Sequence, residues 1–126
     1  MKCMESNNES ARQVVLSYIA ALDRRDYVSA KRYLNSRIRI KGPAGEGFNN
    51  PDEFIEMLQK FTGGYDIKKV FVDGEDVCLL YDFATSTANV FICSWYQVRE
   101  GKITSIQTIF DPRPFGPPTD GRASKV

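Results

Sequence analysis

The fold of this chain is decided by one stretch, residues 65–110, which reads YDIKKVFVDGEDVCLLYDFATSTANVFICSWYQVREGKITSIQTIF. Apolar and polar side chains alternate along most of it, which is the period of two expected of half-buried strands. Asp73-Gly74 is a strong hairpin signal, and residues 84–88 and Glu100-Gly101 supply two further connections. The stretch therefore predicts a meander of four antiparallel strands, at residues 65–72, 76–84, 89–98 and 102–110.

Before the meander, the spacing of apolar residues changes to the three-to-four period of helices. A first helix is predicted from Ser10, its cap, to about Arg24, and Asp26 can cap a short second helix. Asn50-Pro51-Asp52-Glu53 is the clearest helix start, and we expect this third helix to end at Gly63-Gly64. The positions expected to be buried are Val14, Val15, Tyr18, Ile19 and Leu22; Tyr27, Ala30, Tyr33 and Leu34; and Phe54, Met57, Leu58 and Phe61.

Two segments lie between the second and third helices. Ile38 and Ile40 alternate with basic residues, which predicts a short strand, and the glycine-rich residues 42–47 are expected to form a loop. Helices first and consecutive antiparallel strands afterwards form an α+β pattern.

The sequence is of a size and composition typical of one globular domain, with 126 residues of which 42% are apolar and 26% charged. We expect the domain to span residues 10–112. Residues 1–9 are predicted to be a disordered N-terminus. Residues 113–126, which are rich in proline, are predicted to be an extended or disordered tail.

Charge and composition exclude several classes of function. A net charge of +1 gives no electrostatic case for nucleic acid, and no apolar run is long enough to span a bilayer. The polar N-terminus lacks a signal core, so we expect a cytoplasmic protein whose cysteines (Cys3, Cys78 and Cys93) are free thiols. The cysteine spacing fits no metal site, and the chain has no histidine to act as a catalytic base or metal ligand. No cofactor is indicated.

Three motifs, in this order and spacing, resemble the nuclear transport factor 2-like superfamily, and in particular its SnoaL-like and ketosteroid-isomerase-like members. They are Ser17-Tyr18-Ile19-Ala20-Ala21-Leu22-Asp23 followed by Asp26, Trp95-Tyr96-Gln97-Val98-Arg99-Glu100-Gly101-Lys102-Ile103, and Thr108-Ile109-Phe110-Asp111-Pro112. The resemblance implies a cone-shaped fold in which three N-terminal helices pack on a curved antiparallel sheet. It does not fix an activity, because one fold hosts many functions.

The resemblance also allows a test of one activity. Steroid isomerases of this kind use a tyrosine, a protonated aspartate and an aspartate base. Tyr18 falls at the tyrosine position, but Gly42 falls at the base position and Ser94 at the position of the protonated aspartate. Glycine cannot accept a proton and serine is not a carboxylic acid, so we predict that the chain is not a ketosteroid isomerase.

The same alignment assigns the two faces of the sheet, because side chains alternate along a strand. One face is expected to line a ligand pocket with an apolar wall and scattered hydroxyls, although these side chains could instead fill the cone as core. The predicted pocket residues are Tyr18, Phe54, Leu58, Leu79, Tyr81, Ser94, Tyr96, Thr108 and Phe110.

The opposite face is predicted to be too apolar for a monomer and to form a homodimer, as is common in the family. Its residues are expected to be Cys78, Leu80, Phe91, Cys93, Trp95, Ile103, Gln107 and Ile109. Cys78 and Cys93 could approach each other across adjacent strands, although a disulfide is not expected in a cytosolic protein.

These observations favour a SnoaL-like protein that binds a small apolar ligand. One alternative is an isomerase, cyclase or lyase acting on a hydrophobic carbonyl or polycyclic substrate, for which Tyr18 and Asp111 are the candidate catalytic residues. For Asp111 a structural role in the turn into Pro112 is preferred. A second alternative is a dimeric interaction module without a ligand.

Overall fold

The computed structural model describes residues 3–43, 45–48, 50–61 and 63–115. The prediction of an extended tail therefore lies mostly outside the described residues; within them, residues Arg113–Phe115 form a single 3₁₀ turn. The remaining elements are α1 (Cys3–Asp23), α2 (Tyr27–Arg32), β1 (Leu34–Gly42), β2 (Gly45–Phe48), α3 (Pro51–Leu58), β3 (Gly64–Asp73), β4 (Asp76–Ala84), β5 (Asn89–Arg99) and β6 (Lys102–Ile109).

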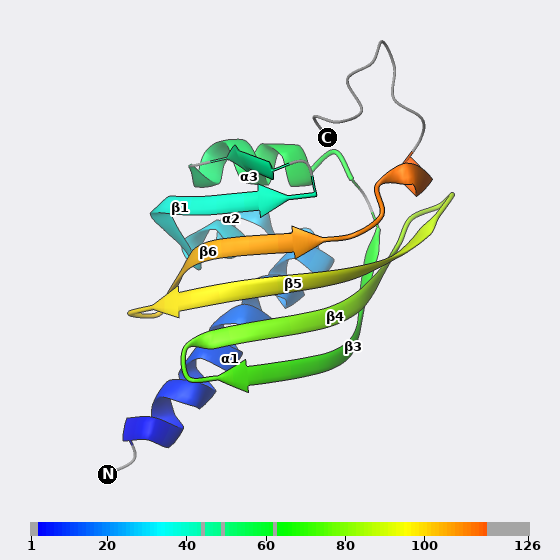
Figure 1. Cartoon of the computed structure of the whole chain (residues 1–126). Coiled ribbons are helices and arrows are strands. Elements are labelled where there is room, and N and C mark those ends of the chain that lie inside the picture. The colour runs from blue at the N-terminus through cyan, green and yellow to red at the C-terminus, as the bar shows by residue number, and fades with distance from the viewer. Residues whose placement is uncertain (1–2, 44, 49, 62, 116–126) are drawn as a thin grey trace.

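The strands form one six-stranded sheet in the order β2-β1-β6-β5-β4-β3. Strands β3 to β6 are the predicted meander, and each pairs antiparallel with its neighbour in sequence. The helices lie on one side of the curved sheet (Figure 1). The expected α+β fold of three N-terminal helices on a curved sheet is therefore confirmed, with the addition that β1 and β6 pair in parallel.

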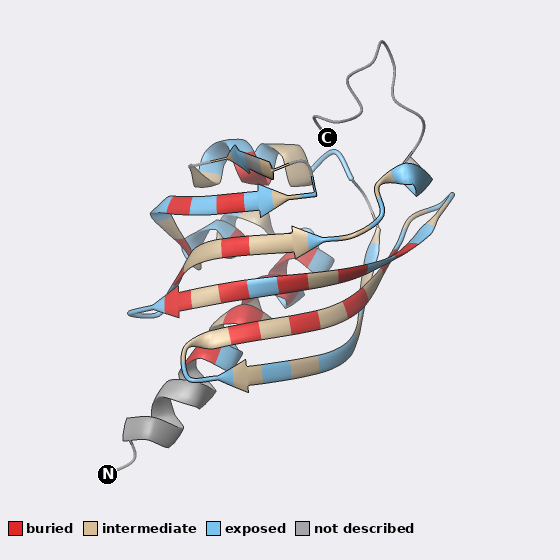
Figure 2. Ribbon diagram, in the orientation of Figure 1, coloured by how far each residue is buried: buried red, intermediate tan, exposed pale blue. Residues whose placement is uncertain are grey.

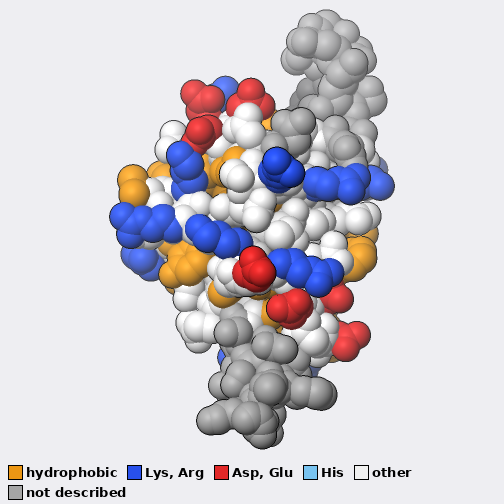
Figure 3. Space-filling view, turned by 90° about the vertical axis from the view of Figure 1, so that its left-hand side faces the viewer, with side chains coloured by type: hydrophobic (Ala, Val, Ile, Leu, Met, Phe, Trp, Pro, Cys, Tyr) orange, Lys and Arg blue, Asp and Glu red, His pale blue; other side chains and the backbone are white. Residues whose placement is uncertain are grey.

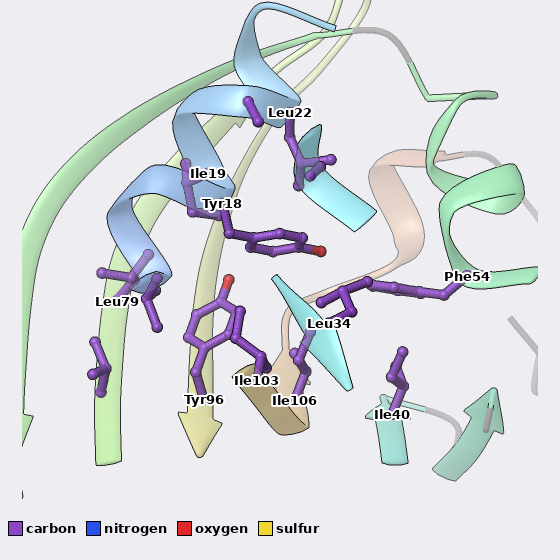
Figure 4. Close-up of a cluster of buried hydrophobic side chains, with 14 of the residues drawn as sticks. Tyr18, Ile19, Leu22, Leu34, Ile40, Phe54, Leu79, Tyr96, Ile103 and Ile106 are labelled. Atoms are coloured by element: carbon purple, nitrogen blue, oxygen red, sulfur yellow. The ribbon is translucent and has the colours of Figure 1, made fainter. Parts of the chain in front are cut away.

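The hydrophobic core lies between the helices and the concave face of the sheet. Burial alternates residue by residue along β4 and β5, as Figure 2 shows, so one face of each strand is buried and the other is not. Side chains of α1, among them Val15, Tyr18 and Ile19, pack from the other side, and Figure 4 shows part of this cluster. No described helix combines the length and apolarity needed to cross a membrane.

The sheet contains a β-bulge in β6 that changes the predicted face of one residue. Val98 pairs with Ile103 and Gln97 with Ser105, so Thr104 is the extra residue, and its hydroxyl donates to the carbonyl oxygen of Gln97 at 3.1 Å. Because a bulge inserts one extra residue, the alternation of inward and outward side chains is shifted by one residue between its two sides. The prediction that Ile103 lies on the outer face is therefore wrong: Ile103 is fully buried in the core.

Several predicted boundaries also differ. Helix α1 begins at Cys3 rather than Ser10, so residues 3–9, predicted as disordered, are helical. Their polar composition gave no apolar stripe, which is the signal from which the helices were predicted. Leu34, which was expected to be buried by the second helix, is instead the first residue of β1, because it pairs with Ile103 of β6.

The glycine-rich segment 42–47 is not all loop. Gly42 pairs with Gly45, and β2 returns along β1, so the segment is a tight hairpin followed by a strand. Helix α3 ends at Leu58 instead of near Gly63-Gly64, because short-range turn bonds replace the helix after it: the amide of Phe61 donates to the carbonyl of Leu58. Phe61, predicted to be buried, is consequently 39% exposed.

Gly63 allows a direct test of how closely the chain packs where it enters β3. A Cβ atom there would lie 2.5 Å from the carbonyl oxygen of Ala84 and 2.9 Å from Cζ of Phe83. We predict that Gly63→Ala destabilises the protein by about 1–3 kcal/mol, the usual effect of overpacking. Gly42→Ala is the control, since no atom lies within 4 Å of its added Cβ. Equal urea midpoints for the two variants would contradict this packing.

Candidate functional site

The inside of the cone contains a row of neutral hydroxyl groups in an otherwise apolar core. The hydroxyls of Tyr81 and Ser94 lie 3.3 Å apart, and those of Ser94 and Thr108 lie 3.1 Å apart. We call these three residues the hydroxyl line. It crosses β4, β5 and β6, because Ser94 is paired with both Leu79 and Thr108 in the sheet register. At 1% exposure, Ser94 is the one polar residue other than tyrosine that is buried among the described residues.

The narrow end of the cone is packed with side chains. The rings of Tyr18 and Tyr96 meet edge to face, with centroids 6.2 Å apart, and both residues are buried. In Figure 4 the Tyr96 hydroxyl points toward the Tyr18 ring, with aliphatic residues such as Leu79 and Ile103 around them. Sequence reasoning placed Tyr18, Leu79 and Tyr96 on the wall of an interior pocket; in the structure all three are buried in the interior.

The other end, which we call the wide end, is less completely covered. Along β6 the inward side chains change from buried Ile103 and Ile106 to half-buried Thr108, and Phe110 just beyond the strand is half-buried too. Leu58 of α3 is a further half-buried member of the same hydrophobic cluster. Thr108, the last member of the hydroxyl line, is therefore the one nearest to solvent.

Two aromatic residues at this site were not predicted. The ring of Tyr65 is tilted against that of Tyr81, with centroids 5.6 Å apart, and meets that of Phe83 edge to face at 5.1 Å. The ring centroids of Phe48 of β2 and Phe54 lie 5.8 Å apart. Tyr65 could have been found from the alternation of its strand, because it lies two residues before Ile67 and therefore on the same face. Phe48 could not be assigned because the segment before it reads as a loop.

The electrostatics of the interior keep its tyrosines neutral. Burial is the main cause that raises the pKa of Tyr18 and Tyr96 well above the usual range, and the neighbouring tyrosines add to it. Burial likewise raises the pKa of Tyr65 and of Tyr81; the hydrogen bond from Ser94 offsets part of the shift at Tyr81. The site can therefore donate and accept hydrogen bonds, but it offers no charge.

Asp111 does not extend the site. Its carboxylate receives two bonds from Nε of Arg113, at 2.9 and 3.0 Å, and one from Nη2 at 2.6 Å, and it also accepts the Arg113 backbone amide at 3.1 Å. These bonds lower the pKa of Asp111, and about half of its side chain is exposed. The geometry is that of a charged turn cap, which is the structural role that the sequence favours. Among the described residues there is no cluster of three or more potential metal ligands.

A separate cavity of about 310 Å³ lies outside the cone, between α2, β1, α3 and β6. Its two lysines already have partners: Lys31 pairs with Asp52, and Lys102 donates to the carbonyl oxygen of Arg32. The cavity is lined by Lys31, Leu34, Asn35, Ser36, Pro51 and Lys102.

The seven basic residues of 24–41 are all exposed, and Figure 3 shows a side of the molecule where basic side chains form a band between groups of acidic ones.

The outer face of the sheet carries exposed apolar side chains in register. Phe71, Cys78, Trp95 and Gln107 form one row across β3, β4, β5 and β6, and Lys41 of β1 continues it. Four of the exposed large hydrophobic residues lie on this face: Phe71 (52%), Phe91 (57%), Trp95 (43%) and Ile109 (62%). All predicted members of the face except Ile103 are on it, and Phe71 is an addition.

Comparison with known proteins places this fold in a family. The model of the SnoaL-like domain matches residues 15–106. The chain belongs to the SnoaL-like family. No curated protein sequence matches it.

Solved structures agree with the SnoaL-like assignment. An NTF2-like protein of unknown function from Cytophaga hutchinsonii is 32% identical over 83% of this chain and 93% of its own, with a TM-score of 0.77. Two more distant structures show the same fold. An NTF2-like protein from Burkholderia xenovorans has 17% identity, coverage of 96% of both chains and a TM-score of 0.77. An epoxide hydrolase of the LEH-like type from M. tuberculosis has 19% identity, coverage of 82% and 84%, and a TM-score of 0.69.

The buried tyrosines make the stability of this SnoaL-like protein sensitive to alkali. Tyrosines of the unfolded chain ionise near pH 10, whereas the pKa values of Tyr18, Tyr65, Tyr81 and Tyr96 are raised in the folded state. Above about pH 10 the folded state therefore binds more protons than the unfolded state, and the free energy of unfolding falls as pH rises.

We predict that phenolate absorbance from these four residues appears only together with loss of structure in an alkaline titration. The measurement follows phenolate absorbance and circular dichroism on the same samples. Ionisation of all six tyrosines while the circular dichroism spectrum stays native would contradict the burial described above.

Proposed function

We propose that this protein binds an uncharged, largely apolar small molecule at the wide end of the cone. The observation that carries the proposal is the hydroxyl line, which begins in the buried core at Tyr81 and Ser94 and ends at half-buried Thr108. Polar groups placed within an apolar wall are the usual composition of a small-molecule site. The apolar part would be supplied by Phe110 and Leu58, both half-buried.

The chemistry of the site limits the ligand. Each hydroxyl of the line can donate one hydrogen bond and accept others, so the line can pair with a carbonyl or hydroxyl of a ligand. A charged ligand would lose its hydration without gaining a partner of opposite charge, because no charged side chain is buried among the described residues. A hydrophobic molecule with one neutral polar group fits these conditions.

A catalytic function finds less support in the same geometry. An isomerase, cyclase or lyase acting on a carbonyl substrate would need a positioned proton acceptor. Asp111, the one carboxylate considered for this role, is bound to Arg113 and has about half of its side chain exposed, and Tyr18 is buried against Tyr96. We therefore prefer binding to acid–base catalysis.

Binding can be tested with 1-naphthol, an aromatic molecule with a single hydroxyl, in titration calorimetry. We expect 1-naphthol to bind and Thr108→Val to weaken its binding about tenfold, which corresponds to the loss of one hydrogen bond. Ser105→Val is the matched control, since Ser105 lies on the same strand in the outer-face row of Gln97. Its affinity for 1-naphthol should equal that of the unmodified protein.

Two results would contradict the proposal. The first is equal affinity of the Thr108→Val variant and the unmodified protein. The second is binding of 1-naphthoate, the charged analogue, as tight as that of 1-naphthol, because the interior described above offers no countercharge.

We further propose that the outer face pairs with a second copy of this chain. The face combines the four exposed apolar residues with charges that differ between its edges: β1 carries Arg37, Arg39 and Lys41, whereas at the turn between β3 and β4 lie Asp73 and Asp76. Further along the same two strands, Asp82 is paired with Lys68. A twofold axis parallel to β5 would lay the basic β1 of one copy over the acidic β3 and β4 of the other. This arrangement would bring the basic strand near Asp73 and Asp76 of the other copy and the apolar residues against each other, as an isologous dimer requires.

We predict that the protein is a dimer in analytical ultracentrifugation and that Trp95→Glu makes it a monomer by placing a charge in the middle of the apolar row. Val28→Glu is the matched control, because Val28 is 69% exposed but lies on α2, away from the sheet face. A monomeric unmodified protein would exclude this dimer, and so would equal dissociation of the two variants.

A further inference from the structure

The outer face contains two thiols in direct contact. Cys78 of β4 and Cys93 of β5 are both half-buried free cysteines, and their sulfur atoms lie 3.6 Å apart. In the sheet register Cys78 is opposite Trp95 and Cys93 is opposite Leu80, so the two cysteines are diagonal neighbours on the same face. Cys78 is a member of the row formed with Phe71, Trp95 and Gln107, and Cys93 lies beside it on the same face.

The two sulfur atoms are in van der Waals contact but not at bonding distance. A disulfide has an S–S length of about 2.05 Å, so the two atoms need to approach by only about 1.5 Å. Diagonal neighbours in a sheet are further apart than directly opposite residues, so closing the bond draws β4 and β5 together and strains them. Strained disulfides are the more easily reduced, labile ones.

We propose that Cys78 and Cys93 form a reversible intramolecular disulfide when the protein meets a low-molecular-weight disulfide such as glutathione disulfide. One cysteine thiolate attacks a sulfur of the reagent and releases one glutathione thiolate, leaving a mixed disulfide. The second cysteine thiolate attacks the protein sulfur of that mixed disulfide and releases the other glutathione. The chain loses two electrons and two protons, and glutathione disulfide becomes two molecules of glutathione.

Burial makes the pair slow to react in the folded protein. Burial is the main cause that raises the pKa of the Cys78 thiol to about 11, and Cys93 beside it adds to the effect. The thiolate is the attacking form of cysteine, so Cys78 is a weak nucleophile at neutral pH. The second attack takes place within the chain, and the contact between the two sulfur atoms favours it.

The bond would connect residues fifteen positions apart and lock the β4–β5 hairpin at the centre of the outer face. Trp95, the one tryptophan of the chain, lies directly opposite Cys78 and so reports on the event. This inference is independent of the proposed ligand in the cone. It concerns the face of the proposed dimer, but the bond is within one chain.

The experiment uses the full chain with Cys3→Ser, which leaves Cys78 and Cys93 as its only thiols. The protein is equilibrated in mixtures of glutathione and glutathione disulfide, starting from folded reduced protein and, in parallel, from protein refolded in the same buffer. Refolding ensures that burial of the thiols does not limit the reaction. We expect both thiols to disappear together, the intact mass to fall by two hydrogens, and the chain to remain single on a non-reducing gel.

Two single variants serve as controls. In Cys78→Ser and in Cys93→Ser, each made in the Cys3→Ser background, the remaining thiol should carry at most one glutathione, and the change in Trp95 emission seen on oxidation should be absent. Excess dithiothreitol should restore both thiols and the original emission of the parent.

Three outcomes would overturn the proposal. Both thiols could stay titratable in glutathione disulfide even after refolding. Each cysteine could carry its own glutathione without a crosslink, or the chains could become linked to one another. A monomeric protein with the intramolecular bond would refute the dimer alone, so the two proposals can fail separately.

Discussion

The β-bulge at Thr104 is the constraint on which the rest of the structure depends. Strand β6 pairs with β5 on one side and with β1 on the other, and both pairings change register at this point. The extra residue lets Ile103 enter the core while Ile106, Thr108 and Phe110 also face inward further along. Because a bulge bends its strand and increases the twist, the sheet can curve around α1 instead of lying flat against it.

The curved sheet encloses an apolar interior whose few polar groups are uncharged. Hydroxyl groups of Tyr81, Ser94 and Thr108 satisfy one another in a row, and no buried side-chain nitrogen or oxygen atom of the described residues lacks a hydrogen-bond partner. The resemblance to steroid isomerases implies that Gly42 and Ser94 stand where those enzymes have catalytic carboxylates. Neutral groups at both positions agree with the proposed binding role.

Much of this could be predicted from the sequence because strand alternation is a strong signal. The meander, the inward positions of β4 and β5 and the family were all predictable, and so was the inward orientation of Tyr81, Ser94 and Thr108. Ile103 and β2 were not: a bulge inserts one residue without a motif, and residues 42–47 resemble a loop until β1 is present to pair with them. Whether a residue such as Tyr18 lines a pocket or fills the core depends on packing from other elements, which periodicity does not contain.

The central claim is that the hydroxyl line ends in a binding site at the wide end of the cone. A crystal structure of the protein grown with 1-naphthol tests this most directly. The account predicts one naphthol with its ring beside Phe110 and its oxygen within hydrogen-bonding distance of Oγ1 of Thr108. Naphthol bound only in the cavity between Lys31 and Lys102, or a wide end filled by the protein's own side chains, would contradict it.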